Sequence, residues 1–152
     1  MNVTIIDDEP PAITLLSAYI QRTKFLELHS TFTDPIDALP IYNSADAPQV
    51  TFLDIEMPGM NGLDFARLIT LKTQIIITSS FRDYGPEAFE LSAVDYLVKP
   101  FSYERFLDAI KKLQTNRLLK LQSISFLSAQ SRKGNMHRSS LVILPSSKAM
   151  TT

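Results

Sequence analysis

The chain has 152 residues, 45% of them hydrophobic and 20% charged, which is the composition of an ordinary globular protein with room for one domain. It has no cysteine, which excludes disulfides, thiolate metal sites and a cysteine nucleophile, and its two histidines, His29 and His137, lack the spacing of a zinc site. The net charge of −1 combines −8 in residues 1–101 with +7 in residues 102–152, so only the C-terminal part could attract a polyanion.

Short apolar segments alternate with segments of helical spacing along the first 113 residues. The apolar segments predict strands at residues 3–6, 27–32, 50–53, 74–78 and 93–98. Apolar residues three or four apart predict helices around Leu16, Leu39, Phe65, Phe89 and Ile110. This alternation predicts parallel βαβ units, and the continuous apolar run at residues 75–77 indicates burial on both faces. We therefore predict an α/β fold, a (βα)5 doubly wound five-stranded parallel sheet.

The last 30 residues have a different composition. Residues 123–152 contain eight serines and four basic residues but no acid, so we interpret them as a Ser-rich basic tail or linker after a domain at residues 1–122. Alternatively, the apolar run at residues 141–144 starts an output domain that this chain lacks. The last helix could extend through Leu118, Leu121 and Ile124, and Gly134-Asn135 predicts a turn.

The sequence gives no sign of export or of a membrane span. The N-terminus has no basic region before a long apolar stretch, and no run approaches the roughly 18 apolar residues of a transmembrane helix. We therefore expect a soluble cytoplasmic protein that does not contact a membrane.

The carboxyl ends of four predicted strands carry residues with the chemistry of a site. In strand order, these residues are Asp7, Asp8 and Glu9, then Asp54, then Thr78, Ser79 and Ser80, and finally Lys99. Ligands of an open parallel sheet bind beyond the carboxyl ends of its strands, so these side chains should converge. Each of them alone could be an ordinary surface or capping residue, but their joint placement favours a shared site.

The residue types at these strand ends indicate phosphate chemistry. Crowded carboxylates repel one another and raise one another's pKa unless a cation joins them. Without cysteine or paired histidines, a hard cation with oxygen ligands such as Mg²⁺ fits best. The ammonium of Lys99 suits a phosphate oxygen or Asp54, and the hydroxyl of Ser79 can donate to a phosphoryl oxygen. The set indicates phosphoryl transfer onto a carboxylate.

Three segments in this order carry a family resemblance. They are residues 6–10 (Ile-Asp-Asp-Glu-Pro), 53–62 (Leu-Asp-Ile-Glu-Met-Pro-Gly-Met-Asn-Gly) and 95–101 (Asp-Tyr-Leu-Val-Lys-Pro-Phe). Over about residues 1–120, the chain resembles a response-regulator receiver domain of bacterial two-component systems. Residues 78–90 are similar to the subgroup with a LytTR-type (LytR/AlgR-like) output domain. The resemblance implies the flavodoxin-like strand order 2-1-3-4-5.

The resemblance also implies roles for the acidic residues. Asp54 would be the phosphoacceptor. Asp8 would bind Mg²⁺ directly and Asp7 mainly through water. The backbone carbonyl of Glu56 would be a further Mg²⁺ ligand.

The remaining roles implied by the resemblance concern the response to phosphorylation. Ser79 would be the switch hydroxyl, Lys99 would pair with the phosphoryl group, and the rotamer of Tyr96 would report the switch. The Lys99–Pro100 peptide bond would be cis, a state that is cheap only before proline. Which of three neighbouring residues supplies the switch hydroxyl stays open: Thr78, Ser79 or Ser80. Ser79 is favoured because its separation from Lys99 along the sequence matches the family.

These roles describe a signalling switch and not an enzyme, apart from slow self-catalysed phosphorylation and dephosphorylation. A sensor histidine kinase would phosphorylate Asp54, and the surface of the fourth helix, fifth strand and fifth helix would then change to control an output such as transcription. Whether the chain forms a homodimer through this surface is left open by the sequence. DNA would be reached only through an output domain that this chain does not contain.

Two other functions compete with that of a switch. A Mg²⁺-dependent phosphatase of the haloacid-dehalogenase type also uses a strand-end aspartate, but it requires a second aspartate where this chain has Glu56, and no cap domain fits the length. A DNA-binding regulator could use the +4 charge of residues 123–152, yet about 30 residues cannot build a LytTR domain.

Overall fold

The structure is a computed structural model that describes the backbone of residues 1–139 and the side chains of residues 1–134. The chain divides into a compact unit, Met1–Thr115, and a second unit that begins at Asn116. Helices and strands alternate throughout the compact unit, and the second unit is helical as far as Ser139.

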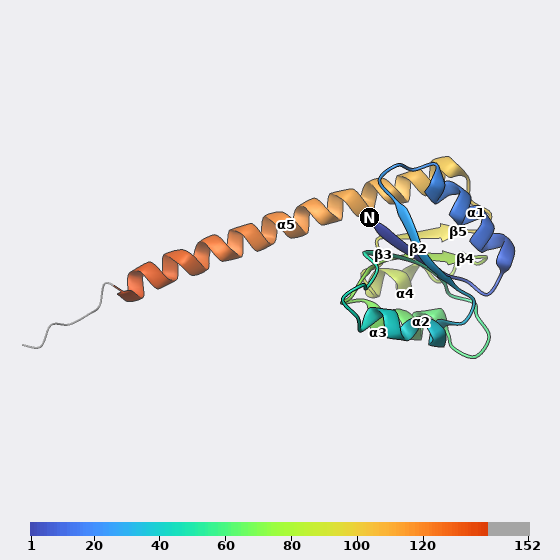
Figure 1. Cartoon of the computed structure of the whole chain (residues 1–152), viewed down its shortest axis with the longest axis horizontal. Coiled ribbons are helices and arrows are strands. Elements are labelled where there is room, and N and C mark those ends of the chain that lie inside the picture. The colour runs from blue at the N-terminus through green and yellow to red at the C-terminus, as the bar shows by residue number, and fades with distance from the viewer. Residues whose placement is uncertain (140–152) are drawn as a thin grey trace, which may run out of the picture. The chain divides into compact units, whose positions relative to one another are not determined.

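The compact unit is built on one parallel sheet (Figure 1). Its strands are β1 (Asn2–Ile6), β2 (Glu27–Phe32), β3 (Val50–Asp54), β4 (Gln74–Ser79) and β5 (Asp95–Val98). The helices are α1 (Pro10–Gln21), α2 (Pro35–Tyr42), α3 (Gly62–Ile69), α4 (Gly85–Glu90) and α5 (Tyr103–Ser139). The spatial order is β2-β1-β3-β4-β5, so the predicted doubly wound, flavodoxin-like (βα)5 fold is confirmed.

Helices cover both faces of the sheet. On one face, α1 and the start of α5 pack on a core that includes Leu16, Phe52 and Phe106. On the other face, α2, α3 and α4 enclose a second core that includes Phe65 and Ile77 (Figure 1). All five residues of β3 are buried, which agrees with the expectation that the central strands are covered on both sides.

The order of the strands places two of the predicted site residues side by side. From β1 the chain goes to β2 on one side and then to β3 on the other, so the direction of winding changes between β1 and β3. Ile6 of β1 is aligned with Leu53 of β3, and the next residues of the two strands are therefore Asp7 and Asp54. This is the switch point where open α/β sheets bind ligands.

The loop after β3 returns close to the end of that strand, and only glycine fits at its closest approach. The N–H of Gly62 donates to the carbonyl of Ile55 at 2.9 Å. A Cβ at Gly62 would lie 2.6 Å from the Cα of Ile55 and closer still to the carbonyl oxygen of Asp54. Because these are backbone atoms, they can make room only if the strand end moves.

Gly62→Ala is therefore expected to lower the free energy of unfolding by at least about 2 kcal/mol, since the added methyl overpacks a rigid backbone contact. Gly85→Ala is the matched control, because nothing lies within 4 Å of a Cβ at that position. Urea denaturation of both variants measures the difference. Equal stability of the two variants would contradict this account of the loop.

The helix of the second unit corrects one prediction. Helix α5 continues to Ser139, so the predicted extension through Ile124 is confirmed and the predicted turn at Gly134-Asn135 is wrong. A glycine inside a helix costs only about 1 kcal/mol relative to alanine, and no proline interrupts this stretch. The apolar run at residues 141–144 lies outside the described residues, and the domain boundary near residue 122 stays a prediction. Within residues 1–139, no helix is long and apolar enough to cross a membrane.

Candidate functional site

Three aspartates meet at the carboxyl ends of β1 and β3. Asp7 and Asp54 are each 1% exposed, and Asp8 is half-buried. Each of the three offers a carboxylate oxygen, and these oxygens all lie within 4.8 Å of one another. Three negative groups this close require a compensating positive charge.

Lys99, which follows β5, supplies one positive charge to this cluster. Its Nζ lies 2.8 Å from Oδ2 of Asp7, 3.4 Å from Oδ2 of Asp54 and 3.9 Å from Oε2 of Glu9. Burial alone would lower the pKa of Lys99, but the hydrogen bond that its ammonium donates to Asp7 and the charges of Asp54 and Asp7 outweigh this effect and raise that pKa. The backbone also fixes this residue, because its N–H donates to the carbonyl of Ser79 at 2.7 Å and the Lys99–Pro100 bond is cis.

One lysine does not neutralise the cluster. Burial and the charge of Asp7 raise the pKa of Asp54 to about 7, although Lys99 and the N–H of Glu56 act to lower it. Apart from the ion pairs with Lys99, one buried oxygen of each aspartate lacks a hydrogen-bond donor in the described part of the chain: Oδ2 of Asp7, Oδ1 of Asp8 and Oδ2 of Asp54. The ligand atoms that this cluster offers are buried carboxylate oxygens, with no nitrogen or sulfur among them, and such a set fits a hard divalent cation such as Mg²⁺.

The hydroxyl residues at the end of β4 differ in their surroundings. The Ser79 hydroxyl is fully buried and donates to Oε1 of Glu56. The Thr78 hydroxyl is buried without a hydrogen-bond partner among the described residues, and Ser80 is exposed. The other oxygen of Glu56, Oε2, accepts the N–H of Ser80 at 3.3 Å.

Tyr96 lies on β5 and is linked to the same loop. Its hydroxyl donates to the carbonyl oxygen of Phe81, and the N–H of Phe81 donates to Oγ of Ser79 at 3.0 Å. Burial is the main cause that raises the pKa of Tyr96, so its hydroxyl stays protonated as a donor. The loop after β4 thus connects Ser79 with Tyr96.

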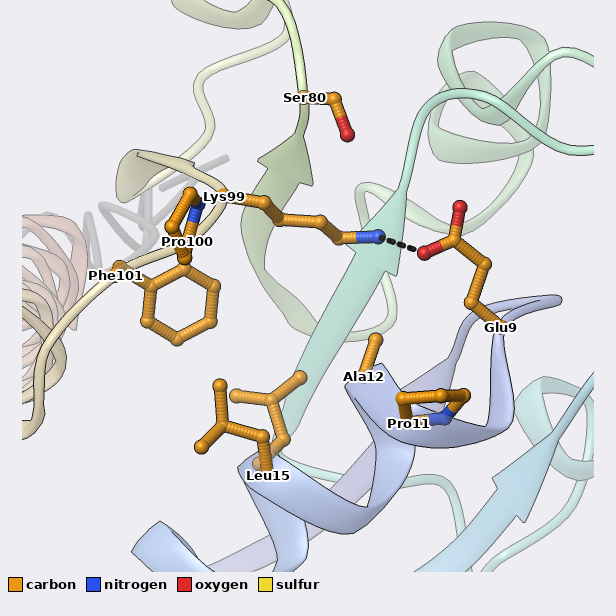
Figure 2. Close-up of a pocket in the computed structure, with 9 residues that line it drawn as sticks. Glu9, Pro11, Ala12, Leu15, Ser80, Lys99, Pro100 and Phe101 are labelled. Atoms are coloured by element: carbon orange, nitrogen blue, oxygen red, sulfur yellow. Dashed lines mark ion pairs between the residues drawn. The ribbon is translucent and has the colours of Figure 1, made fainter.

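A cavity of about 340 Å³ opens on the Glu9 side of Lys99. Its floor is apolar and comes from α1 and from the segment after β5, with Leu15, Leu16 and Phe101 among its residues. Figure 2 shows the Lys99 side chain reaching across this cavity toward Glu9, with Ser80 on the other side of the lysine. The Lys99 side chain therefore lines the cavity, while its ammonium nitrogen is buried.

The family model for the response regulator receiver domain matches residues 3–111. The chain belongs to this family. The receiver domain's relatives include the sensory transduction protein LytT of Oceanobacillus iheyensis, which is 36% identical over 119 residues that cover 75% of this chain and 48% of LytT. These relatives are regulators of the LytTR type, so the predicted family and subgroup are confirmed. The chain spans about half the length of such curated relatives.

Solved structures of receiver domains agree with this assignment. The response regulatory domain of MrkE from Klebsiella pneumoniae has 32% identity and a TM-score of 0.70, over 76% of this chain and 97% of that one. TrrA from Thermotoga maritima, solved in complex with Mg²⁺ and BeF, has 29% identity and a TM-score of 0.63, over 74% and 97%. A receiver domain is a phosphoacceptor switch and not an enzyme, as the sequence predicted.

The side-chain contacts of Glu56 in the receiver site were not predicted from the sequence. Glu56 was expected to contribute its backbone carbonyl, whereas its side chain contacts Ser79 and Ser80 across from β3 to β4. The only signal in the sequence was an acid two residues after Asp54, in a loop whose path no periodicity defines.

Asp54 is expected to make the Mg²⁺-free receiver less stable as pH rises. Its pKa is raised from 3.8 to about 7, so the folded state favours the protonated carboxyl, and this stabilisation is lost as pH rises toward 7. Asp54→Asn removes the titration, and its stability advantage should grow by about 1–3 kcal/mol between pH 5 and pH 8. Denaturation of both proteins in EDTA at the two pH values measures this growth. A constant difference would show that Asp54 keeps an ordinary pKa.

Proposed function

We propose that this receiver accepts a phosphoryl group on Asp54 from a sensor histidine kinase and thereby controls an output. The observation that carries the proposal is the position of Asp54 at the end of buried β3, 3.4 Å from the ammonium of Lys99 and within the three-aspartate cluster. Burial and the charge of Asp7 raise its pKa, so the charge of this carboxylate is poorly compensated by the protein alone. A bound cation would compensate this charge and keep the carboxylate ionised, which is the form that accepts a phosphoryl group.

The cation in this proposal is Mg²⁺. Asp7, Asp8 and Asp54 would hold it together with the backbone carbonyl of Glu56. The all-oxygen donor set supports this choice, and so does the Mg²⁺ complex named for the related TrrA. Mg²⁺ at such a site neutralises charge on the transferring phosphoryl group.

In the transfer itself, a carboxylate oxygen of Asp54 attacks phosphorus, the bond from phosphorus to the imidazole nitrogen of the donor histidine breaks, and that nitrogen keeps the electron pair. Lys99 pairs with a phosphoryl oxygen, which replaces part of its present ion pairing with Asp7. Ser79 donates its hydroxyl to another phosphoryl oxygen. Because the loop after β4 links Ser79 to Tyr96, the aromatic side chain changes its position with it.

We propose that the surface formed by α4, β5 and the part of α5 up to Thr115 changes on phosphorylation and thereby controls the output. It is called here the α4–β5–α5 surface. Regulators of the LytTR type act on transcription, so this receiver would reach DNA through an output domain. Phe89 on α4 is 86% exposed, so a partner that binds through α4 would cover it. If that contact is a homodimer, sedimentation should show association when beryllofluoride and Mg²⁺ are added together.

Uptake of phosphate tests the proposed function. Incubation with acetyl phosphate and Mg²⁺ is expected to add one phosphoryl group per chain, visible by mass spectrometry, and EDTA should prevent it. A chain that stays unlabelled under these conditions is not a functional phosphoacceptor. Rapid, continuous release of phosphate from a phosphomonoester would instead support the phosphatase alternative.

A further inference from the structure

Glu56 makes contacts that the proposed phosphoacceptor function does not use. Its Oε1 accepts the hydroxyl of Ser79, and its Oε2 accepts the N–H of Ser80 at 3.3 Å. Its own N–H donates to Oδ1 of Asp54 at 3.1 Å. Glu56 is therefore tied both to the proposed phosphoacceptor and to the end of β4.

The contact with Glu56 uses the only proton of the Ser79 hydroxyl. A serine hydroxyl has one O–H donor, and its lone pairs can only accept. Oγ of Ser79 already accepts the N–H of Phe81 at 3.0 Å, and its proton goes to Glu56. Ser79 cannot donate to Glu56 and to a phosphoryl oxygen at the same time, so the two contacts exclude each other.

Charge acts in the same direction as this competition. Glu56 is joined to Asp54 through its backbone, and a phosphoryl group on Asp54 adds roughly one to two negative charges close to the Glu56 carboxylate. Two anions that share one donor repel each other. Phosphorylation therefore disfavours the present position of Glu56.

We propose that the carboxylate of Glu56 is a latch that holds the Ser79 hydroxyl in the unphosphorylated receiver and must release it before Ser79 can bind the phosphoryl group. This inference rests on the proposed function of Asp54 and adds a regulator of the same site. Release of the Ser79 hydroxyl by Glu56 would also affect Tyr96 on β5, because Ser79 is joined through Phe81 to the Tyr96 hydroxyl. The latch thus sets how easily the site and the α4–β5–α5 surface enter the activated state.

Removal of the latch should favour activation. In the presence of Mg²⁺, Glu56→Ala is expected to bind beryllofluoride about tenfold more tightly than the wild type, which corresponds to about 1.4 kcal/mol. Glu56→Gln keeps an acceptor oxygen without the charge, so its affinity should fall between the two. Binding is followed by titration of the NMR amide spectrum.

A double-mutant cycle separates the latch from a general effect of charge. In a Ser79→Ala background there is no hydroxyl to compete for, so Glu56→Ala should change beryllofluoride affinity less than about threefold. An equal tightening in both backgrounds would mean that Glu56 acts only through its charge, and the latch would be wrong.

The resting state provides an independent readout. Without Mg²⁺ or beryllofluoride, Glu56→Ala should shift the amide resonance of Ser80, whose N–H loses its acceptor, while Glu90→Ala on α4 should leave it in place. An unmoved Ser80 amide together with normal beryllofluoride binding would overturn the latch alone. Failure of the wild type to bind beryllofluoride would overturn the proposed function and, with it, the latch.

Discussion

Asp54→Asn is expected to abolish labelling by acetyl phosphate in the presence of Mg²⁺, a loss on the order of 100-fold or more because an amide is not a nucleophile for phosphorus. The neighbouring acids should not take over. Asp7 accepts the N–H of Glu9 at 2.9 Å and is held by Lys99 at 2.8 Å, a shorter ion pair than the 3.4 Å contact between Lys99 and Asp54. Asp54 lies at the end of the central strand, where Lys99 can stabilise a phosphoryl group.

The control for this experiment is Asp46→Asn, which removes an exposed acid from the segment before β3, whereas Asp54 lies at the other end of that strand. It should label like the wild type. Intact mass spectrometry counts phosphoryl groups, and peptide mapping locates them. Undiminished labelling of Asp54→Asn would refute the assignment of the phosphoacceptor.

Lys99→Ala is expected to separate cation binding from the response to phosphorylation. The three aspartates that would hold Mg²⁺ remain, and the loss of a competing ammonium should leave Mg²⁺ affinity intact. The phosphoryl group, however, loses a charge-assisted hydrogen bond, so beryllofluoride affinity should fall roughly 10- to 100-fold. The change at Tyr96 and any association of chains should fall with it.

Lys24→Ala, at an exposed position of the same chain, is the matched control for the loss of one positive charge. Mg²⁺ affinity is measured by calorimetry, and the response by the amide spectrum with beryllofluoride. If Lys99→Ala showed the full response of the wild type, Lys99 would have only a structural role in pairing with Asp7 and Asp54.

The central part of the site could be predicted because the topology of the sheet determines it. Buried, β-branched strands separated by helices predict a parallel sheet, and a parallel sheet brings its carboxyl ends together. The positions of Asp7, Asp54 and Lys99 at the carboxyl ends of three strands were therefore enough to place them together. No knowledge of loop conformation was needed for these residues.

The contacts of Glu56 and Tyr96 could not be predicted in the same way. Both depend on the path of a loop after a strand, which side-chain periodicity does not describe. The continuation of α5 through Gly134 was missed for a different reason, because serine, glycine and asparagine indicate a turn in isolation although each is tolerated inside a helix. Local composition was a poor guide where no core packing selects the structure.

The most direct test of the switch is the amide spectrum of the wild-type chain with Mg²⁺ alone and with Mg²⁺ plus beryllofluoride. The account predicts that beryllofluoride shifts the resonances at Asp54, and that the shifts extend through Ser79, Ser80 and Phe81 to Tyr96 and the α4–β5–α5 surface. Shifts that stayed confined to the aspartate cluster, with Tyr96 and its neighbours on β5 unchanged, would contradict it.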